Sequence, residues 1–213
     1  FLAIFLFLKK YTSFLQYFKK EALLKMTELR RFLVINGDIF IRTVCLTAAF
    51  GFFYSQSSVG GEMILAVNVI LMQFVNWMSY AVDGFAFAAE SLVGKYKGAE
   101  DEKGTHKAIR LSFVWGMILA GLYSIAYLGF GEDFLYVFTD KVDVVEASIP
   151  FLFWMVLFPI ISTPCYIWDG VFIGLTASVA MRKCMIWAIL VFIGVYYLFM
   201  LPYGNHGLWM VLL

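Results

Sequence analysis

Long apolar runs separated by short polar stretches make up the pattern of this chain. Each complete run has the ~20 residues that a helix needs to cross the hydrocarbon core of a bilayer, whereas a membrane barrel would show alternating segments of ~10 residues. A short apolar run at 1–8 predicts the end of a preceding membrane helix. The predicted fold is an all-α integral membrane protein, a polytopic helix bundle at 32–213. Its predicted spans lie at about 32–54, 62–93, 107–130, 146–174, 183–202 and 206–213, the last of them truncated.

Composition supports the membrane class and excludes others. The 213 residues are 62% hydrophobic and 15% charged, against ~45–50% and ~25% in a soluble domain. No basic stripe of the kind that contacts nucleic acid is present. The glycines at 94–104 lack the closing Gly-Lys-Ser/Thr of a phosphate-binding loop. The sequence therefore predicts a protein that is not an enzyme, has no nucleic-acid partner and, if it transports, uses an ion gradient.

Basic residues gather in alternate loops. Segment 9–31 carries seven of the sixteen lysines and arginines, the loop at 55–61 has none, and the next loop is basic again. By the positive-inside rule, 9–31 is cytoplasmic and the chain is a multi-pass protein of the inner cell membrane. Apolar residues recur every three or four positions in 11–31, which favours an amphipathic connector lying on the membrane surface. A long basic loop is the alternative.

The three cysteines, Cys45, Cys165 and Cys184, all lie in apolar runs and have no metal-ligand spacing. We expect them to be small buried apolar residues rather than a disulfide or a metal site.

A short phrase occurs twice in the chain. Tyr-x-x-Asp-Gly stands at 80–84 (the first box) and again at 166–170 (the second box). Both predicted helices run in the same direction, so the boxes lie at comparable depth. Chance is one explanation, and a structural repeat of the kind found in many transporters is the other. Pro159 and Pro164 predict a kink before the second box, and the glycine after each aspartate would let helices approach closely.

Four charged residues fall at membrane depth, where each costs about 3 kcal/mol or more and normally faces protein or water. Asp38 and Arg42 stand four apart and share a helix face, so they could form a neutralising pair. Alternatively, Asp38, Asp83 and Asp169 gather around Arg42 and bind and release a proton or sodium ion as the conformation changes. Asn68 and Tyr80 are further candidates for the same cavity. No catalytic residue, metal site or cofactor is predicted beyond the coupling ion.

Four stretches carry a resemblance to a known family. They are "NGDIFIRTVCLTAAF" at 36–50, "YAVDGFAFAAESLVGKYKGAED" at 80–101, "YIWDGVFIGLTASVAMR" at 166–182 and "GNHGLW" at 204–209. They resemble the MATE transporters, the multidrug and toxic compound extrusion family, and within it the branch named for the DNA-damage-inducible protein F. The resemblance implies that 32–213 is the C-terminal six-helix lobe of a twelve-helix transporter, whose N-terminal bundle is its partner.

The resemblance also implies a function. The family exports cationic, often aromatic compounds in exchange for protons or sodium, and by similarity Asp38, Arg42, Asp83 and Asp169 are the coupling candidates in this bundle. Some members carry a glutamate in the seventh helix where this chain offers Asp38 and Arg42, which argues against a simple sodium site. The leading hypothesis is multidrug efflux by cation antiport with alternating access, acting on small cationic or amphipathic compounds within membrane lipid. A lipid-linked glycan flippase of the same fold and a non-transporting membrane scaffold are the alternatives.

Overall fold

The chain folds entirely into helices where its structure, a computed structural model, describes it. The described part is Phe7 and residues 26–213, without the side chains at 28, 31, 199 and 200. The predicted helix end at 1–8 and most of the predicted connector at 9–31 lie outside these residues. The main helices are α3 (Met26–Val59), α4 (Glu62–Gly98), α5 (Glu102–Phe138), α6 (Val142–Ser148), α7 (Leu152–Gly174), α8 (Ser178–Val195) and α9 (Gly204–Leu212).

Five stretches are long and apolar enough to cross a membrane: Phe32–Val59, Glu62–Gly98, Glu102–Phe138, Val142–Gly174 and Ser178–Leu198. The prediction of an all-α membrane bundle is therefore confirmed. The helices run further than the apolar stretches, because lysine and glutamate favour helix although they are polar. The turn between α4 and α5 is accordingly short, and Asp101 caps α5 by accepting a hydrogen bond from the backbone N–H of Gly104 at 2.8 Å.

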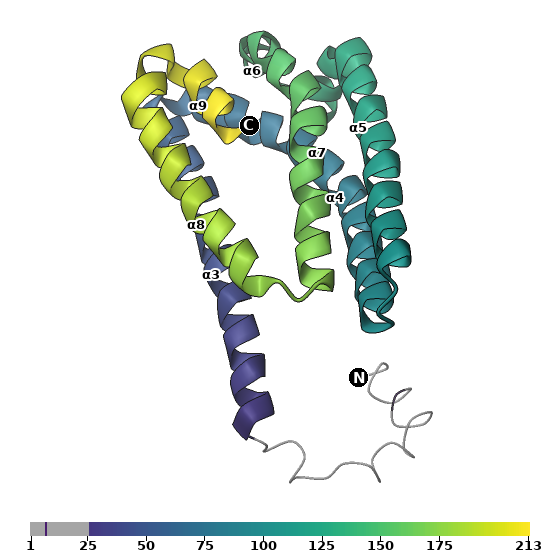
Figure 1. Ribbon diagram of the computed structural model, residues 1–213. Coiled ribbons are helices and arrows are strands. Elements are labelled where there is room, and N and C mark those ends of the chain that lie inside the picture. Colours follow the sequence, from purple (N-terminus) through teal and green to yellow (C-terminus); the bar gives the residue numbers. More distant parts are fainter. Residues whose placement is uncertain (1–6, 8–25) are drawn as a thin grey trace.

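The helices form two groups (Figure 1). Helices α4, α5 and α7 pack closely against one another, and α3 packs chiefly along α8. Hydrogen bonds reinforce the first group: Tyr127 of α5 donates to the carbonyl of Phe74 at 2.7 Å, and Ser124 donates to the carbonyl of Val156 at 2.7 Å. Contacts between the groups are fewer. The five long helices of the described chain therefore form a three-helix group and a two-helix group, the α3/α8 pair.

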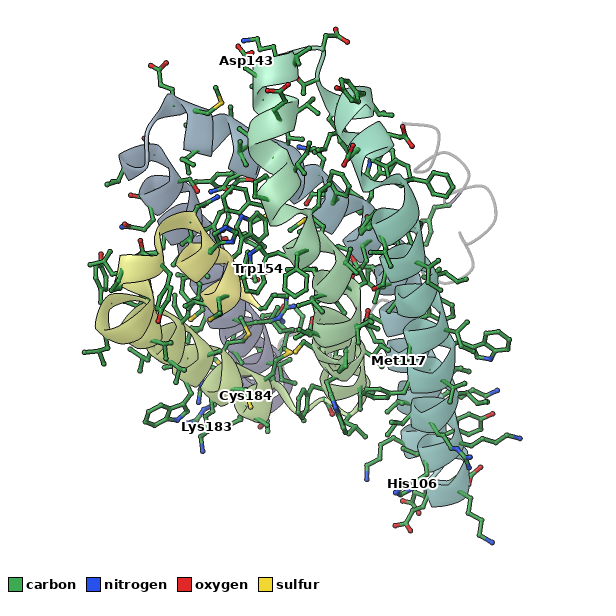
Figure 2. All side chains as sticks on the ribbon, turned by 90° about the horizontal axis from the view of Figure 1, so that it is seen from above. His106, Met117, Asp143, Trp154, Lys183 and Cys184 are labelled. Atoms are coloured by element: carbon green, nitrogen blue, oxygen red, sulfur yellow. The ribbon has the colours of Figure 1, made fainter. Side chains whose placement is uncertain are left out.

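The start of α3, the α4–α5 turn and the α7–α8 turn lie at one end of the bundle (Figure 1). We call this the basic end, because it carries almost all of the described lysines and arginines. Lys183 points out of the bundle there (Figure 2). At the opposite end Lys141 is the one basic residue among those that the structure describes. The assignment of the basic end to the cytoplasm stays a prediction.

Glycines allow α4 and α7 to touch backbone to backbone. Gly170 of the second box lies against the carbonyl of Ala86, and a Cβ added to Gly174 would stand 2.6 Å from the carbonyl oxygen of Glu90. Such small-xxx-small spacing brings membrane helices together. Gly84 of the first box has no atom within 4 Å of where its Cβ would stand. The expected close approach therefore occurs at one box and not at the other.

Helix α7 continues through Pro159 and Pro164, and the kink expected there stays a prediction. In α5 the backbone departs from helical geometry at Phe130, where φ is −129° and ψ is 15°.

Substituting the two box glycines tests this packing. Gly170→Ala places a methyl group against the backbone of Ala86, so we expect a loss of about 1–3 kcal/mol of stability. Gly84→Ala has open space around it and is expected to be neutral or slightly stabilising, since alanine favours helix over glycine by about 1 kcal/mol. Thermal unfolding of the two purified variants in detergent measures the difference. Equal losses for both would contradict the packing account.

Candidate functional site

The membrane-depth charges form two separate ion pairs, and each joins two helices. Arg182 of α8 donates to Asp38 of α3, and Arg42 of α3 donates to Asp169 of α7. The hypothesis that Asp38 and Arg42 neutralise each other is therefore wrong. The two side chains share α3, but each forms its ion pair with a residue of another helix. Asp38 pairs with α8, and Arg42 pairs with α7.

The Asp38–Arg182 pair lies near the basic end, within the α3/α8 pair. Asp38 is 1% exposed, and its second oxygen accepts a hydrogen bond from the Ser178 hydroxyl at 2.8 Å. The Arg182 side chain is 31% exposed. The carboxylate is thus held on both oxygens, while its arginine reaches solvent. Arg182 is not singled out by the sequence analysis as a partner for Asp38. Its place one turn into α8 would have been the signal.

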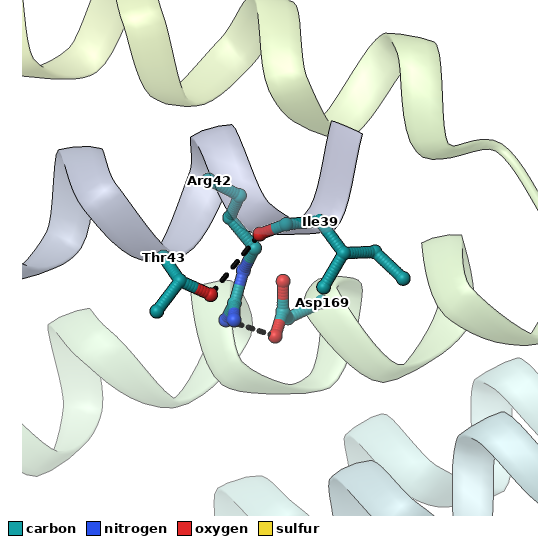
Figure 3. A network of polar contacts seen from close by, with 4 residues as sticks. All are labelled: Ile39, Arg42, Thr43 and Asp169. Carbon is teal, nitrogen blue, oxygen red and sulfur yellow. Dashed lines mark hydrogen bonds and ion pairs between the residues drawn. The ribbon is translucent and has the colours of Figure 1, made fainter. Parts of the chain in front are cut away.

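The Arg42–Asp169 pair joins the two helix groups (Figure 3). The side chains are 23% and 26% exposed, so the pair is partly buried. The Nε of Arg42 is buried and has no hydrogen-bond partner among the described residues. Beside it, the Thr43 hydroxyl donates to the carbonyl of Ile39 at 3.0 Å. Arg42 therefore retains a donor that this conformation does not use.

Asp83 of α4 is half-buried and lies within electrostatic range of both Arg42 and Asp169. Within the described residues it makes no hydrogen bond or ion pair. We call Arg42, Asp83 and Asp169 the charge triad. One cation and two carboxylates from three helices are thus within electrostatic range of one another, whereas Asp38 pairs with Arg182, and a coupling role for these residues stays a prediction.

The tyrosines of the two boxes differ in their surroundings. The hydroxyl groups of Tyr166 and Ser79 are 2.6 Å apart, which links α7 to α4 beside the triad. Tyr80 is 78% exposed on α4. The tyrosines of the two boxes therefore make different contacts, although the boxes have the same sequence pattern.

Asn68 lies far from the triad. It is fully buried on α4, donates to Ser57 and to Asn205, and accepts from the Trp209 indole at 2.8 Å. Ser57 stands 15 residues after Arg42, or roughly 22 Å along α3 at about 1.5 Å per residue. We call Asn68 and its three partners the amide clamp. The clamp joins α3, α4 and α9, and the Asn68 amide is hydrogen-bonded through both its nitrogen and its oxygen.

Two of the cysteines are not buried as expected. Cys165 and Cys184 are exposed on the described chain, and Cys45 is half-buried. Cys165 and Cys184 line a cavity of about 400 Å³ between α7 and α8, which Asp169 also lines. Their helices diverge at this level, so thiols in apolar runs remain accessible.

Comparison with known proteins identifies the family. The MatE family model matches residues 40–200. The chain belongs to the MatE family. It is 35% identical over 184 residues to the DNA damage-inducible protein F of Escherichia coli (strain K12), and the match covers 86% of this chain and 40% of that relative. The chain thus spans less than half the length of this MatE relative. No solved structure matches. Membership of MatE and the five stretches that are long and apolar enough to cross a membrane together make this a multi-pass membrane chain.

The Asp38–Arg182 pair predicts an asymmetric response. Arg182→Gln leaves a buried carboxylate without its counter-charge, so we expect a loss of about 3–5 kcal/mol. Asp38→Asn leaves an arginine that already reaches solvent, and the loss should be smaller. The double variant should be more stable than Arg182→Gln alone, because it leaves no lone charge. Thermal unfolding of the three proteins is the measurement, and equal losses in the two single variants would refute the buried-carboxylate account.

The amide clamp predicts that Asn68 acts on stability. Asn68→Ala leaves the buried N–H of Trp209 and the amide of Asn205 without partners, at about 1–3 kcal/mol for each unsatisfied group. Asn76→Ala is the matched control, because Asn76 is exposed on the same helix and changes at such sites stay within about 0.5 kcal/mol. The melting temperatures of the two variants measure the difference. If the amide clamp did not stabilise the fold, both variants would melt at the temperature of the parent protein.

Proposed function

We propose that this chain forms one bundle of a secondary exporter in the inner cell membrane, with its basic end in the cytoplasm. The exporter moves small cationic or amphipathic compounds outward in exchange for a proton or a sodium ion, by alternating access against an N-terminal bundle of the same protein. Membership of MatE supports transport, and the charge triad supports ion coupling.

The triad carries this proposal because it has one cation for two acids. Arg42 is paired with Asp169, while Asp83 lies nearby and has no partner among the residues that the structure describes. If Arg42 moved to Asp83, Asp169 would become the unpaired acid. A carboxylate that loses its counter-charge in a low-dielectric region takes up a proton or a metal cation instead. Ion uptake would then follow the position of the arginine.

The positions of the pairs favour this interpretation. Arg42–Asp169 bridges the α3/α8 pair and the three-helix group, so relative movement of the groups changes its geometry. Asp38–Arg182 lies inside the α3/α8 pair and would travel with it unchanged. Switching elements in proteins are interfaces with two arrangements rather than continuously deformable cores. We therefore assign coupling to Arg42, Asp83 and Asp169, and anchoring to Asp38 and Asn68.

The substrate path is proposed to pass the exposed face of α4. Asn76 and Tyr80 precede Asp83 by seven and three residues, so all three share one helix face. Asn76 and Tyr80 are exposed in this chain. An amide, a phenol and a carboxylate in line would suit a cation with polar or aromatic parts. A glycan flippase would instead need positive charge for a pyrophosphate, and Arg42 is already neutralised by Asp169.

Transport by the complete reading frame that encodes this chain tests the proposal. In everted vesicles from an efflux-deficient host, Asp83→Asn and Asp169→Asn should each lower ion-driven export of ethidium or norfloxacin by roughly tenfold or more, about 1.4 kcal/mol in the barrier. Asp143→Asn, at the opposite end of the bundle, is the control and should transport normally.

Three results would count against the proposal. Parental rates and ion dependence in both triad variants would remove the coupling role. No export or drug resistance from the parent, together with a surface polysaccharide defect in the knockout, would favour a flippase. Absence of both phenotypes would favour a scaffold.

A further inference from the structure

A cavity of about 400 Å³ lies at the basic end, between the first turns of α3 and the start of α8. We call it the inner cavity. It shares no lining residue with the cavity that Asp169 lines. Its lining residues are Thr27, Arg30, Val34 and Ile35 of α3, Thr176 of the α7–α8 turn, and Ser178 and Val179 of α8.

The lining of the inner cavity changes from polar to apolar along both helices. On α3, Arg30 stands just before the apolar stretch of the helix, and Val34 lies four residues further in, or roughly 6 Å at about 1.5 Å per residue. On the other wall, Thr176 stands before α8 and Val179 lies inside it. A phospholipid at the surface of a bilayer has the same order, with a polar headgroup outside and acyl chains inside.

Arg30 is exposed and has no hydrogen bond or ion pair among the described residues, whose two ion pairs use Arg42 and Arg182 instead. The N–H donors of its guanidinium are therefore available to another partner. A guanidinium recognises a phosphate group through two parallel N–H···O bonds. Thr27 stands three residues before Arg30 on the same helix face and adds a hydroxyl group to the polar part of the cavity.

Positive charge exceeds negative charge around the inner cavity. Segments 26–38 and 178–183 together carry four basic residues and two acids. One residue of each sign, Arg182 and Asp38, is used in the ion pair between α8 and α3. At the α4–α5 turn, segment 90–110 carries five basic residues and four acids, so charge is nearly balanced there. The surplus at the α3/α8 pair favours anionic lipid, and basic pockets between membrane helices bind such headgroups.

The apolar walls of the inner cavity are open to the surroundings of the bundle. Val34 is 50% exposed and Val179 is 45% exposed, although both lie within apolar stretches that are long enough to cross a membrane. An acyl chain can therefore lie against both valines while the phosphate of the same lipid lies at Arg30.

We infer that the inner cavity binds one anionic phospholipid of the cytoplasmic leaflet, with its phosphate on Arg30 and Thr27 and its acyl chains against Val34 and Val179. The assignment to the cytoplasmic leaflet rests on the proposed function, whereas binding itself requires no transport. A zwitterionic lipid would bring an ammonium group close to Arg30 and into the surplus of positive charge. Inorganic phosphate would make no use of the apolar walls.

Native mass spectrometry of the complete protein measures lipid binding directly. The protein is purified in non-ionic detergent and titrated with dioctanoyl phosphatidylglycerol, which is anionic, or with dioctanoyl phosphatidylcholine, which is zwitterionic and has the same chains. Inorganic phosphate is the competitor in a third series. The variants are Arg30→Gln, Arg30→Lys and Arg110→Gln. Arg110 is the matched control, because it is an exposed arginine near the same end, on α5, that does not line the inner cavity.

The parent protein should bind the anionic lipid more tightly than the zwitterionic one. Arg30→Gln should raise the Kd of the first anionic lipid by roughly tenfold, because it removes a hydrogen bond between charged partners. Arg30→Lys should have a smaller effect, since lysine keeps the charge but cannot form two parallel bonds. Arg110→Gln should bind as the parent does. Thermal unfolding without lipid should be the same for all four proteins, because both arginines are exposed.

Four results would overturn the inference. An unchanged Kd in Arg30→Gln would show that the phosphate does not lie at Arg30. Equal losses in Arg30→Gln and Arg110→Gln would indicate general attraction of anions to the basic end. Equal affinity of the parent for both lipids would assign the cavity to acyl chains alone, and full displacement of the lipid by inorganic phosphate would make it a phosphate site. None of these results bears on whether the protein exports ethidium, so the inference and the proposed function fail separately.

Discussion

An unpaired charge inside a bilayer is costly, and this constraint organises the bundle. A charged side chain inside a span needs an opposite charge or water, and in the two ion pairs of the described residues the opposite charge lies on another helix. Asp38 meets Arg182 across α3 and α8, and Arg42 meets Asp169 across α3 and α7. The pairs therefore decide which helices stay together as much as apolar packing does. Between membrane helices, apolar packing has little preference over lipid.

The two ion pairs differ in what surrounds them, and the proposed division into an anchoring pair and a switching pair rests on that difference. Asp38 is almost fully buried and is held on both oxygens. Arg42 and Asp169 are each about a quarter exposed, a donor of Arg42 is unused, and a second acid lies nearby. A carboxylate whose oxygens are both hydrogen-bonded has one set of partners, whereas one arginine near two acids can pair with either of them. An ion from solution that binds one of the two acids would favour pairing of the arginine with the other.

Apolar periodicity predicted the fold class and the positions of the five spans, because membrane thickness sets the length of each run. It underestimated helix ends, since charged residues such as Lys97 continue a helix into water. It could not predict ion-pair partners, because the four-residue step from Asp38 to Arg42 is visible in sequence and the crossing of α3 with α7 is not. The spacing of small residues could not tell the two boxes apart, because Gly170 is followed four positions later by Gly174 and Gly84 by Ala88, yet only Gly170 touches another helix backbone. Asn68 could not be told from a cavity residue, because its partners lie 11, 137 and 141 residues away.

Arg42 is outnumbered by the acids around it. It is paired with Asp169, its Nε has no hydrogen-bond partner among the described residues, and Asp83 lies within electrostatic range. Under the proposed function, movement of Arg42 from Asp169 to Asp83 would neutralise one acid and leave the other without its counter-charge. A carboxylate left in this way inside a low-dielectric region takes up a cation from solution. Ion exchange would then follow from the shortage of positive charge in the triad.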